Sequence, residues 1–298
     1  MTMTQPGKIA VLTDSNCDLP QQYFKKYPIF RLPLVISCGG QEYRDGIDIT
    51  VEEVYRRQPD ETFKTSLPMR ADIDATLDAI ARAGYTQVIV LPLAGALSGT
   101  ANQLRLIAKE RTDLDIAVFD TKSASIGVGI QAVQVAQYAV AGMEFEPLKK
   151  LTAQLIEDTT ALFSLDTLEY LRRGGRIGRA TAVAGALLQI KPILMFDREG
   201  VITTAAKVRG RNAVQAKLLD LVEKIRADAP VTPAFNLVVC DGGVPEEGRR
   251  LEEQLKKRMP GYHQIIHGSL SATLAVHLGP NLLGAGIQLL RTTPPPLD

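Results

Sequence analysis

Cysteine and unbalanced charge are both scarce in this sequence. The cysteines are Cys17, Cys38 and Cys240, which lie far apart and form no CxxC pair. Neither a zinc site nor a disulfide framework is therefore indicated. The 34 Lys and Arg residues nearly balance the 33 Asp and Glu residues, so the formal net charge is only +1. Because a nucleic-acid-binding protein normally carries a broad basic face, the charge argues against that class.

Long uninterrupted apolar runs are also missing. The N-terminal residues MTMTQPGK lead directly into the strand-like IAVLTD, without the apolar core of a signal peptide. The most apolar long stretch, residues 124–142, is interrupted by Gln131, Gln134 and Gln137. This pattern favours a buried helix over a membrane span. We expect a cytoplasmic protein without an integral membrane segment.

The order of periodic segments predicts an α/β fold with two domains, because 298 residues exceed the usual size of one core. In the first half, β-branched runs alternate with segments of helical spacing. Strands are expected at 9–12, 88–91 and 116–119, and helices at 71–83, 100–111 and 123–141. This alternation predicts an N-terminal domain, residues 1–160, with a parallel sheet flanked by helices. The segment 30–36 also resembles a strand, which Pro33 would confine to an edge or a bulge.

The second half has a different pattern. The sequence DREG lies between apolar runs at 192–196 and 201–204, which is typical of a hairpin. Helices are expected at 212–227 and 246–258, and strands at 235–239 and 262–267. These elements predict a C-terminal α/β domain, residues 161–298, whose sheet is mixed.

Hydroxyl-bearing segments follow several expected strands. Thr13, Asp14 and Ser15 end the first strand, where ligands gather in open α/β sheets, so they are candidates for supporting a site. Their alternative role is capping the next helix or fixing a turn. Thr65 and Ser66 are expected as an exposed hydroxyl pair on a loop, with helix capping as the alternative.

Two further loops could face a ligand. Ser98 and Gly99 lie between a strand and a helix, an arrangement that points backbone amides at an anion, although Ser98 could simply cap the helix. The segment lacks the lysine of a P-loop, so a nucleotide is not indicated. His277 lies in a small-residue loop before Gly279-Pro280, and its spacing from the other histidines matches no metal site.

The segment LDTLEYLRRGGRIG, residues 165–178, combines three arginines with a glycine pair. Arg172, Arg173 and Arg176 surround Gly174-Gly175 at the end of a short helix-like stretch. Such a cationic turn could hold an anion or face an acidic partner, or it could be a solvated helix end. Arg209 follows in KVRG.

A catalytic arrangement is not indicated by the sequence. There is no Ser–His–Asp spacing, no Cys–His signature and no metal-ligand cluster, so we expect neither an enzyme nor a metal or cofactor. Asp45 and Asp48 could be read as paired carboxylates, but a short exposed loop explains both.

Taken in order, these motifs resemble the DegV family, the fatty-acid-binding proteins that serve bacterial fatty acid kinase. The resemblance spans residues 8 to 285, nearly the whole chain. The matching segments are IAVLTDSNCDLP, YRDGIDIT, FKTS, ALSGTANQ, VFDTKSASIGVG, LEYLRRGGRIG, KPILMFDREGVI with KVRG, and HLGP. Two positions depart from the family pattern, namely Asn281 after HLGP and the segment LAGA at 93–96 before LSGT.

The resemblance implies two α/β domains with a long-chain fatty acid held between or beneath them. The carboxylate would be bound by Thr65, Ser66, Ser98, Gly99 and His277, and which hydroxyl of the Thr65-Ser66 pair faces it stays open. The acyl chain would lie in an apolar tunnel, mostly of the second domain, with walls at 182–188 and 193–196.

The resemblance also implies a partner. A separate kinase would phosphorylate the bound fatty acid to an acyl phosphate, while this chain carries and presents it. The residues that would contact the kinase or the incoming phosphate are Arg172, Arg173, Arg176 and Arg209. The alternative is a hydrolase or transferase on the same scaffold, acting on a small acyl or phosphoryl substrate.

Overall fold

The first half of the chain folds around a parallel four-stranded sheet. The computed structural model describes residues 8–183, 189–230 and 234–297. The strands follow the order β2 (Ile29–Leu32), β1 (Ile9–Asp14), β6 (Gln87–Leu91) and β7 (Asp115–Val118). All neighbouring pairs are parallel, which confirms the predicted sheet.

Helices cover both faces of this sheet because its strands are apolar on both sides. Ala10 and Leu12 of β1 pack against α3 (Arg70–Arg82) and α4 (Thr100–Glu110). Ile9 and Val11 point to the opposite face and pack with α5 (Ile126–Val140) and α1 (Gln21–Lys26). Alternate strand residues thus serve two cores, as expected for a parallel sheet buried between helices.

A mixed six-stranded sheet forms the second half. Its order is β10 (Ile202–Arg209), β9 (Ile190–Phe196), β8 (Thr159–Ser164), β13 (Leu282–Leu290), β11 (Ala234–Gly242) and β12 (Ile265–Ser269). Only the pair β11–β12 is parallel, so the predicted mixed sheet and the β9–β10 hairpin are confirmed. Helices α8 (Asn212–Asp228) and α9 (Pro245–Arg258) cover its outer face.

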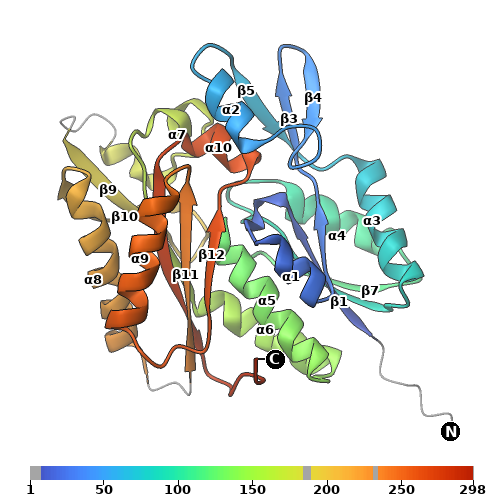
Figure 1. Cartoon of the computed structure of the whole chain (residues 1–298). Coiled ribbons are helices and arrows are strands. Elements are labelled where there is room, and N and C mark those ends of the chain that lie inside the picture. The colour runs from blue at the N-terminus through green and yellow to red at the C-terminus, as the bar shows by residue number, and fades with distance from the viewer. Residues whose placement is uncertain (1–7, 184–188, 231–233, 298) are drawn as a thin grey trace, which may run out of the picture.

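Helix α5 lies between the two large sheets and packs, with α6 (Phe145–Glu157), against both (Figure 1). Every residue from Ile126 to Tyr138 is buried, which explains a helix that is apolar all round. Its glutamines make hydrogen bonds inside the protein: Gln134 accepts from Asn236 at 2.8 Å, and Gln137 exchanges hydrogen bonds with Gln264. In the described part of the chain, none of the helices is both long and apolar enough for a bilayer.

A third, three-stranded antiparallel sheet was not predicted. It contains β4 (Gln41–Arg44), β3 (Val35–Cys38) and β5 (Phe63–Ser66), and it packs with α2 (Val51–Arg57) and α10 (Ala272–Leu278). The prediction of one strand at 30–36 is wrong, because Pro33 and Leu34 separate β2 from β3 and the two strands join different sheets. Proline cannot donate to a ladder, and β2 is indeed an edge strand.

The change from the parallel to the mixed sheet falls at β8, which begins at Thr159. The division into domains of residues 1–160 and 161–298 stays a prediction. One continuous core joins Val11 of β1, Val133 of α5 and Val238 of β11.

Candidate functional site

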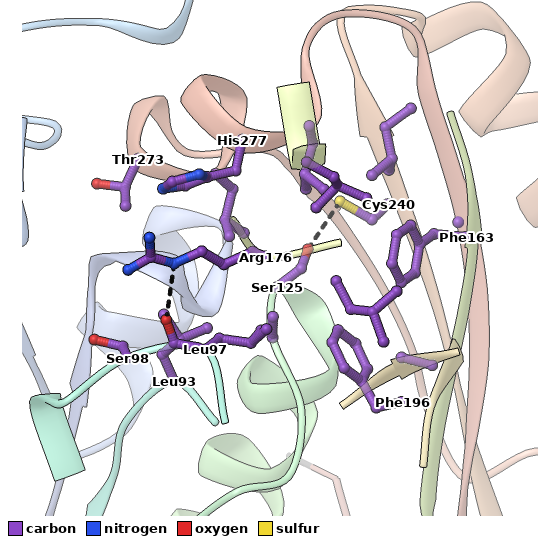
Figure 2. Close-up of a pocket in the computed structure, with 18 of the residues that line it drawn as sticks. Leu93, Leu97, Ser98, Ser125, Phe163, Arg176, Phe196, Cys240, Thr273 and His277 are labelled. Carbon is purple, nitrogen blue, oxygen red and sulfur yellow. Dashed lines mark hydrogen bonds between the residues drawn. The ribbon is translucent and has the colours of Figure 1, made fainter. Parts of the chain in front are cut away.

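A cavity of about 1140 Å³, counted with the solvent in its mouth, lies between the mixed sheet, α10, β5 and the N-terminal ends of α4 and α5. Most of its lining is apolar, and polar side chains gather at one end. Figure 2 shows Thr273, His277, Arg176 and Ser98 on one side of the cavity and Phe163 and Phe196 on the other. The cavity therefore combines a polar end with a predominantly apolar body, which is the usual composition of a small-molecule site.

Thr65 and His277, which are 212 residues apart in the sequence, meet at the polar end. Thr65 Oγ1 lies 2.7 Å from His277 Nε2. The prediction of a loop at Thr65-Ser66 is wrong, because both residues belong to β5 and pair with Ile36 and Val35 of β3. Both line the cavity, but Thr65 is half-buried and Ser66 is exposed.

The imidazole of His277 is neutral in this environment. Burial, and secondly the nearby positive charge of Arg176, lower the pKa of His277 to about 4. Its Nδ1 has no hydrogen-bond partner among the described residues, and it faces Gly174. A ring protonated on Nε2 donates to Thr65 and leaves the threonine hydroxyl proton free to point into the cavity. His277 lies in the last turn of α10 and not in a loop as expected, and the chain turns only at Gly279, where φ is 66°.

Ser98 and Gly99 immediately precede α4, which confirms the predicted order of strand, small-residue loop and helix. Gly99 is the N-cap residue, and Ser98 Oγ accepts from the amide of Thr100 at 3.3 Å and lies 2.8 Å from its hydroxyl. Both Ser98 and Gly99 line the cavity. The positive end of the α4 dipole thus borders the polar end, where an anionic group would be stabilised.

Of the four arginines singled out in the sequence, only Arg176 lines the cavity. Its guanidinium donates to the carbonyl oxygens of Leu97 at 3.2 Å and Gly174 at 2.6 Å. Arg172 and Arg173 lie at the end of α7 (Glu169–Arg173), exposed and paired with Glu169.

Arg209 lies at the opposite end of β10 from Ile202, which lines the cavity. The rise of a strand places it roughly 20 Å from that residue. The structure therefore does not gather the four arginines at one point.

Thr13 and Asp14 belong to the end of β1 and Ser15 to the following 3-10 turn, not to a loop as expected, and none of the three lines the cavity. Asp14 accepts from the amide of Leu93 at 2.9 Å, and Ser15 accepts from the amide of Leu34 at 3.1 Å. Leu34 and Leu93 do line the cavity. Asp14 also accepts from the amide of Asn16 at 3.1 Å, which caps the 3-10 turn Ser15–Cys17, and burial raises the pKa of Asp14 to about 7.

Asp45 is a functional support that the sequence did not predict. The expectation of an exposed loop fits Asp48, which pairs with Arg44, but it is wrong for Asp45, which is 2% exposed. The Asp45 carboxylate accepts from the hydroxyl of Ser15 at 2.7 Å and from the amides of Ala272 and Thr273 at 3.1 and 3.2 Å. It therefore caps the N-terminus of α10, the helix that carries His277.

The apolar body of the cavity contains two aromatic rings and part of the mixed sheet. The ring centroids of Phe163 and Phe196 are 5.6 Å apart. Cys240, Gly284 and Phe163 are direct neighbours in register across β11, β13 and β8. Of the predicted wall 193–196, Phe196 lines the cavity, whereas Ile193 packs against α8 in the opposite core. The predicted wall 182–188 falls outside the part of the chain whose side chains the structure describes.

Comparison with known proteins gives one consistent result. The chain matches the family model described as "Uncharacterised protein, DegV family" over residues 8–289. A DegV domain-containing protein of Clostridium perfringens is 34% identical over 94% of this chain and 98% of its own length.

Two solved structures share the fold. A DegV family protein of Thermus thermophilus, described as binding fatty acid, has a TM-score of 0.87 and 28% identity, covering 95% of this chain and 100% of its own. A stearic acid-binding protein of Eubacterium ventriosum has a TM-score of 0.84 and 26% identity, covering 94% and 98%. With a match over nearly its whole length, this chain belongs to the DegV family.

Proposed function

We propose that this protein binds a long-chain fatty acid, with the carboxylate at the polar end of the cavity and the acyl chain along its apolar body. The observation that carries the proposal is the cavity itself, which joins the Thr65–His277 pair at one end to Phe163 and Phe196 at the other. The fatty-acid binding described for the Thermus and Eubacterium relatives supports the same ligand.

The energetics suit such a ligand. Each CH₂ group removed from water contributes about 0.8 kcal/mol, so the acyl chain supplies most of the affinity. The head group would be bound by the hydroxyls of Thr65 and Ser98, with the amide end of α4 at Gly99. Neutral donors avoid the desolvation penalty of a fully buried ion pair. Between the two hydroxyls of β5, the half-buried Thr65 is our choice for the contact over the exposed Ser66.

The fatty acid would then be presented to a separate kinase. Arg176 lines the polar end, and Arg172 and Arg173 lie exposed on the adjoining helix α7. Their positive charge suits an incoming phosphate or an acidic face of the kinase. Hydrolysis by this chain itself is disfavoured, because the low pKa of His277 makes it a poor base for activating Thr65 near neutral pH.

Purified protein is expected to retain a long-chain fatty acid, detectable by native mass spectrometry. The double substitution Thr65→Val with Ser98→Ala should lower fatty-acid affinity by at least about tenfold, because each lost hydrogen bond to a charged group contributes about 1.5–3 kcal/mol. Ser66→Ala is the matched control and should retain the lipid. Ligand-free wild-type protein that hydrolyses acyl esters would contradict the proposal.

The kinase role makes a separate prediction. Reversing the charge of both Arg172 and Arg173 to Glu should slow phosphorylation of the bound fatty acid by about tenfold or more, since rim charges mainly set association rates. Lipid content should not change, because both side chains are exposed and neither lines the cavity. Arg209→Glu, a reversal at the opposite end of β10, is the control. Equal slowing by Arg209→Glu would contradict a docking face confined to α7.

A further inference from the structure

Two polar side chains lie partway along the otherwise apolar body of the cavity. Ser125 Oγ lies 3.2 Å from Cys240 Sγ, and both residues line the cavity. Figure 2 shows this pair between the end marked by His277 and Ser98 and the end marked by Phe163 and Phe196. An acyl chain that runs from one end to the other must therefore pass the Ser125–Cys240 pair.

The mixed sheet leaves room for the acyl chain to lie against the Ser125–Cys240 pair. Gly284 of β13 lies in register between Cys240 of β11 and Phe163 of β8. Neighbouring strands are about 4.8 Å apart, so the absence of a side chain at Gly284 leaves a shallow path directly beside Cys240. A Cβ atom at Gly284 would lie 3.1 Å from the carbonyl oxygen of Leu162 and 3.5 Å from Cβ of Phe163, so a side chain at this position would crowd the neighbouring strand and stand in the path.

Ser125 is held in place by a strained backbone and a buried carboxyl group. Its φ of 57° and ψ of −145° are unusual for a residue with a side chain, and a glycine would adopt them more readily. The Ser125 hydroxyl lies 2.5 Å from Oδ2 of Asp18, while Oδ1 of Asp18 accepts from the amide of Ser271 at 2.8 Å. The chain thus keeps a hydroxyl at a position where the backbone favours glycine.

The hydrogen-bonding capacity of the pair is not exhausted by its own contacts. Burial raises the pKa of the Cys240 thiol, so the thiol keeps its proton, and burial raises the pKa of Asp18 to about 8. If Asp18 is ionised, Ser125 donates to it and can accept from the Cys240 thiol. One lone pair of the serine oxygen then remains free to accept a hydrogen bond from a ligand. If Asp18 is protonated and donates to Ser125, the serine proton becomes free. A hydroxyl group on the ligand can bond in either case, because it both donates and accepts.

We propose that the Ser125–Cys240 pair recognises a hydroxyl group carried partway along the acyl chain, so that mid-chain hydroxy fatty acids are preferred ligands. This inference rests on the proposed fatty-acid binding. A saturated chain is still accepted, since Ser125, Cys240 and Asp18 satisfy one another when no ligand hydroxyl is present.

Competition binding to the wild-type protein tests the inference without any substitution. Dissociation constants are measured for stearic acid, for its 10- and 12-hydroxy derivatives, and for the 2-hydroxy and terminally hydroxylated derivatives. At least one mid-chain isomer should bind about fivefold or more tighter than the terminally hydroxylated one, as one satisfied hydrogen bond allows. Mid-chain isomers that bind no tighter than the terminal one would overturn the inference, while tight stearic acid binding would leave the proposed function intact.

Two substitutions locate the effect. Cys240→Ala and Ser125→Ala should each reduce the preference for the mid-chain isomer by about threefold or more, with stearic acid affinity changed less than that. Cys240→Ala leaves the bond between Ser125 and Asp18 in place, so it remains informative if Ser125→Ala destabilises the fold. An unchanged preference in Cys240→Ala and in folded Ser125→Ala would overturn the assignment to this pair. If the wild-type protein does not bind stearic acid at all, the proposed fatty-acid binding itself is contradicted.

Discussion

Gly174→Ala is expected to lower fatty-acid affinity by about tenfold or more, although the backbone at this position suits alanine. Gly174 has φ −73° and ψ −11°, in the ordinary helical region, so conformation alone does not require glycine. A Cβ atom there would lie 2.3 Å from Nδ1 of His277, far inside contact distance. Because the nearest atoms belong to the side chain of His277, we expect the imidazole to move and its 2.7 Å hydrogen bond with Thr65 to break. The glycine pair of the cationic turn is thereby linked to the polar end of the cavity.

The measurement is the amount of co-purified lipid per protein by native mass spectrometry, together with the affinity of the stripped protein. We expect affinity to fall by about tenfold or more, while overpacking costs the fold about 1–3 kcal/mol. Gly175→Ala is the matched control in the same turn, because an added Cβ would meet no atom within 4 Å, so it strains the backbone at φ 69° without touching His277. Full lipid retention by Gly174→Ala would contradict the role given to His277.

A double-mutant cycle separates the ring from the turn. If Gly174→Ala acts only through His277, adding it to His277→Ala should change affinity little further, because the side chain it displaces is already absent. Additive losses would mean that the turn affects ligand binding through another contact, for example the one between Arg176 and the carbonyl of Gly174.

The elements that the sequence predicted well are those with local signals. The apolar runs at β1, β6 and β7 and the helical spacing of α3, α4 and α8 depend only on neighbouring residues. The small-residue loop before α4 was likewise predicted, since strand, loop and helix are contiguous there. By contrast, β5 is only four residues long and is stabilised by pairing with β3, so nothing within FKTS distinguished it from a loop.

The polar end of the cavity could not be derived from spacing, because its members are distant in the chain. Only the family resemblance connects Thr65 with His277 in the sequence, and their contact depends on how α10 packs beside β5. Helix α10 has only seven residues, too few for a clear helical period, and its N-cap residue, Ser271, makes no side-chain capping bond. The cap is supplied by Asp45, 227 residues away from Ala272, and no local pattern can show such a partner.

Asp45→Ala is therefore expected to reduce both stability and ligand binding strongly. The substitution leaves the amides of Ala272 and Thr273 and the hydroxyl of Ser15 without their buried acceptor, at a cost of about 3 kcal/mol or more in the free energy of unfolding. Because α10 also carries His277, fatty-acid affinity should fall in protein that remains folded. Asp48→Ala is the control three residues along: it removes only exposed bonds to the guanidinium and the amide of Arg44, so it should cost about 1 kcal/mol and clearly less than Asp45→Ala. Urea unfolding of lipid-free protein measures the difference, and equal effects of the two substitutions would mean that α10 does not depend on Asp45 for its position.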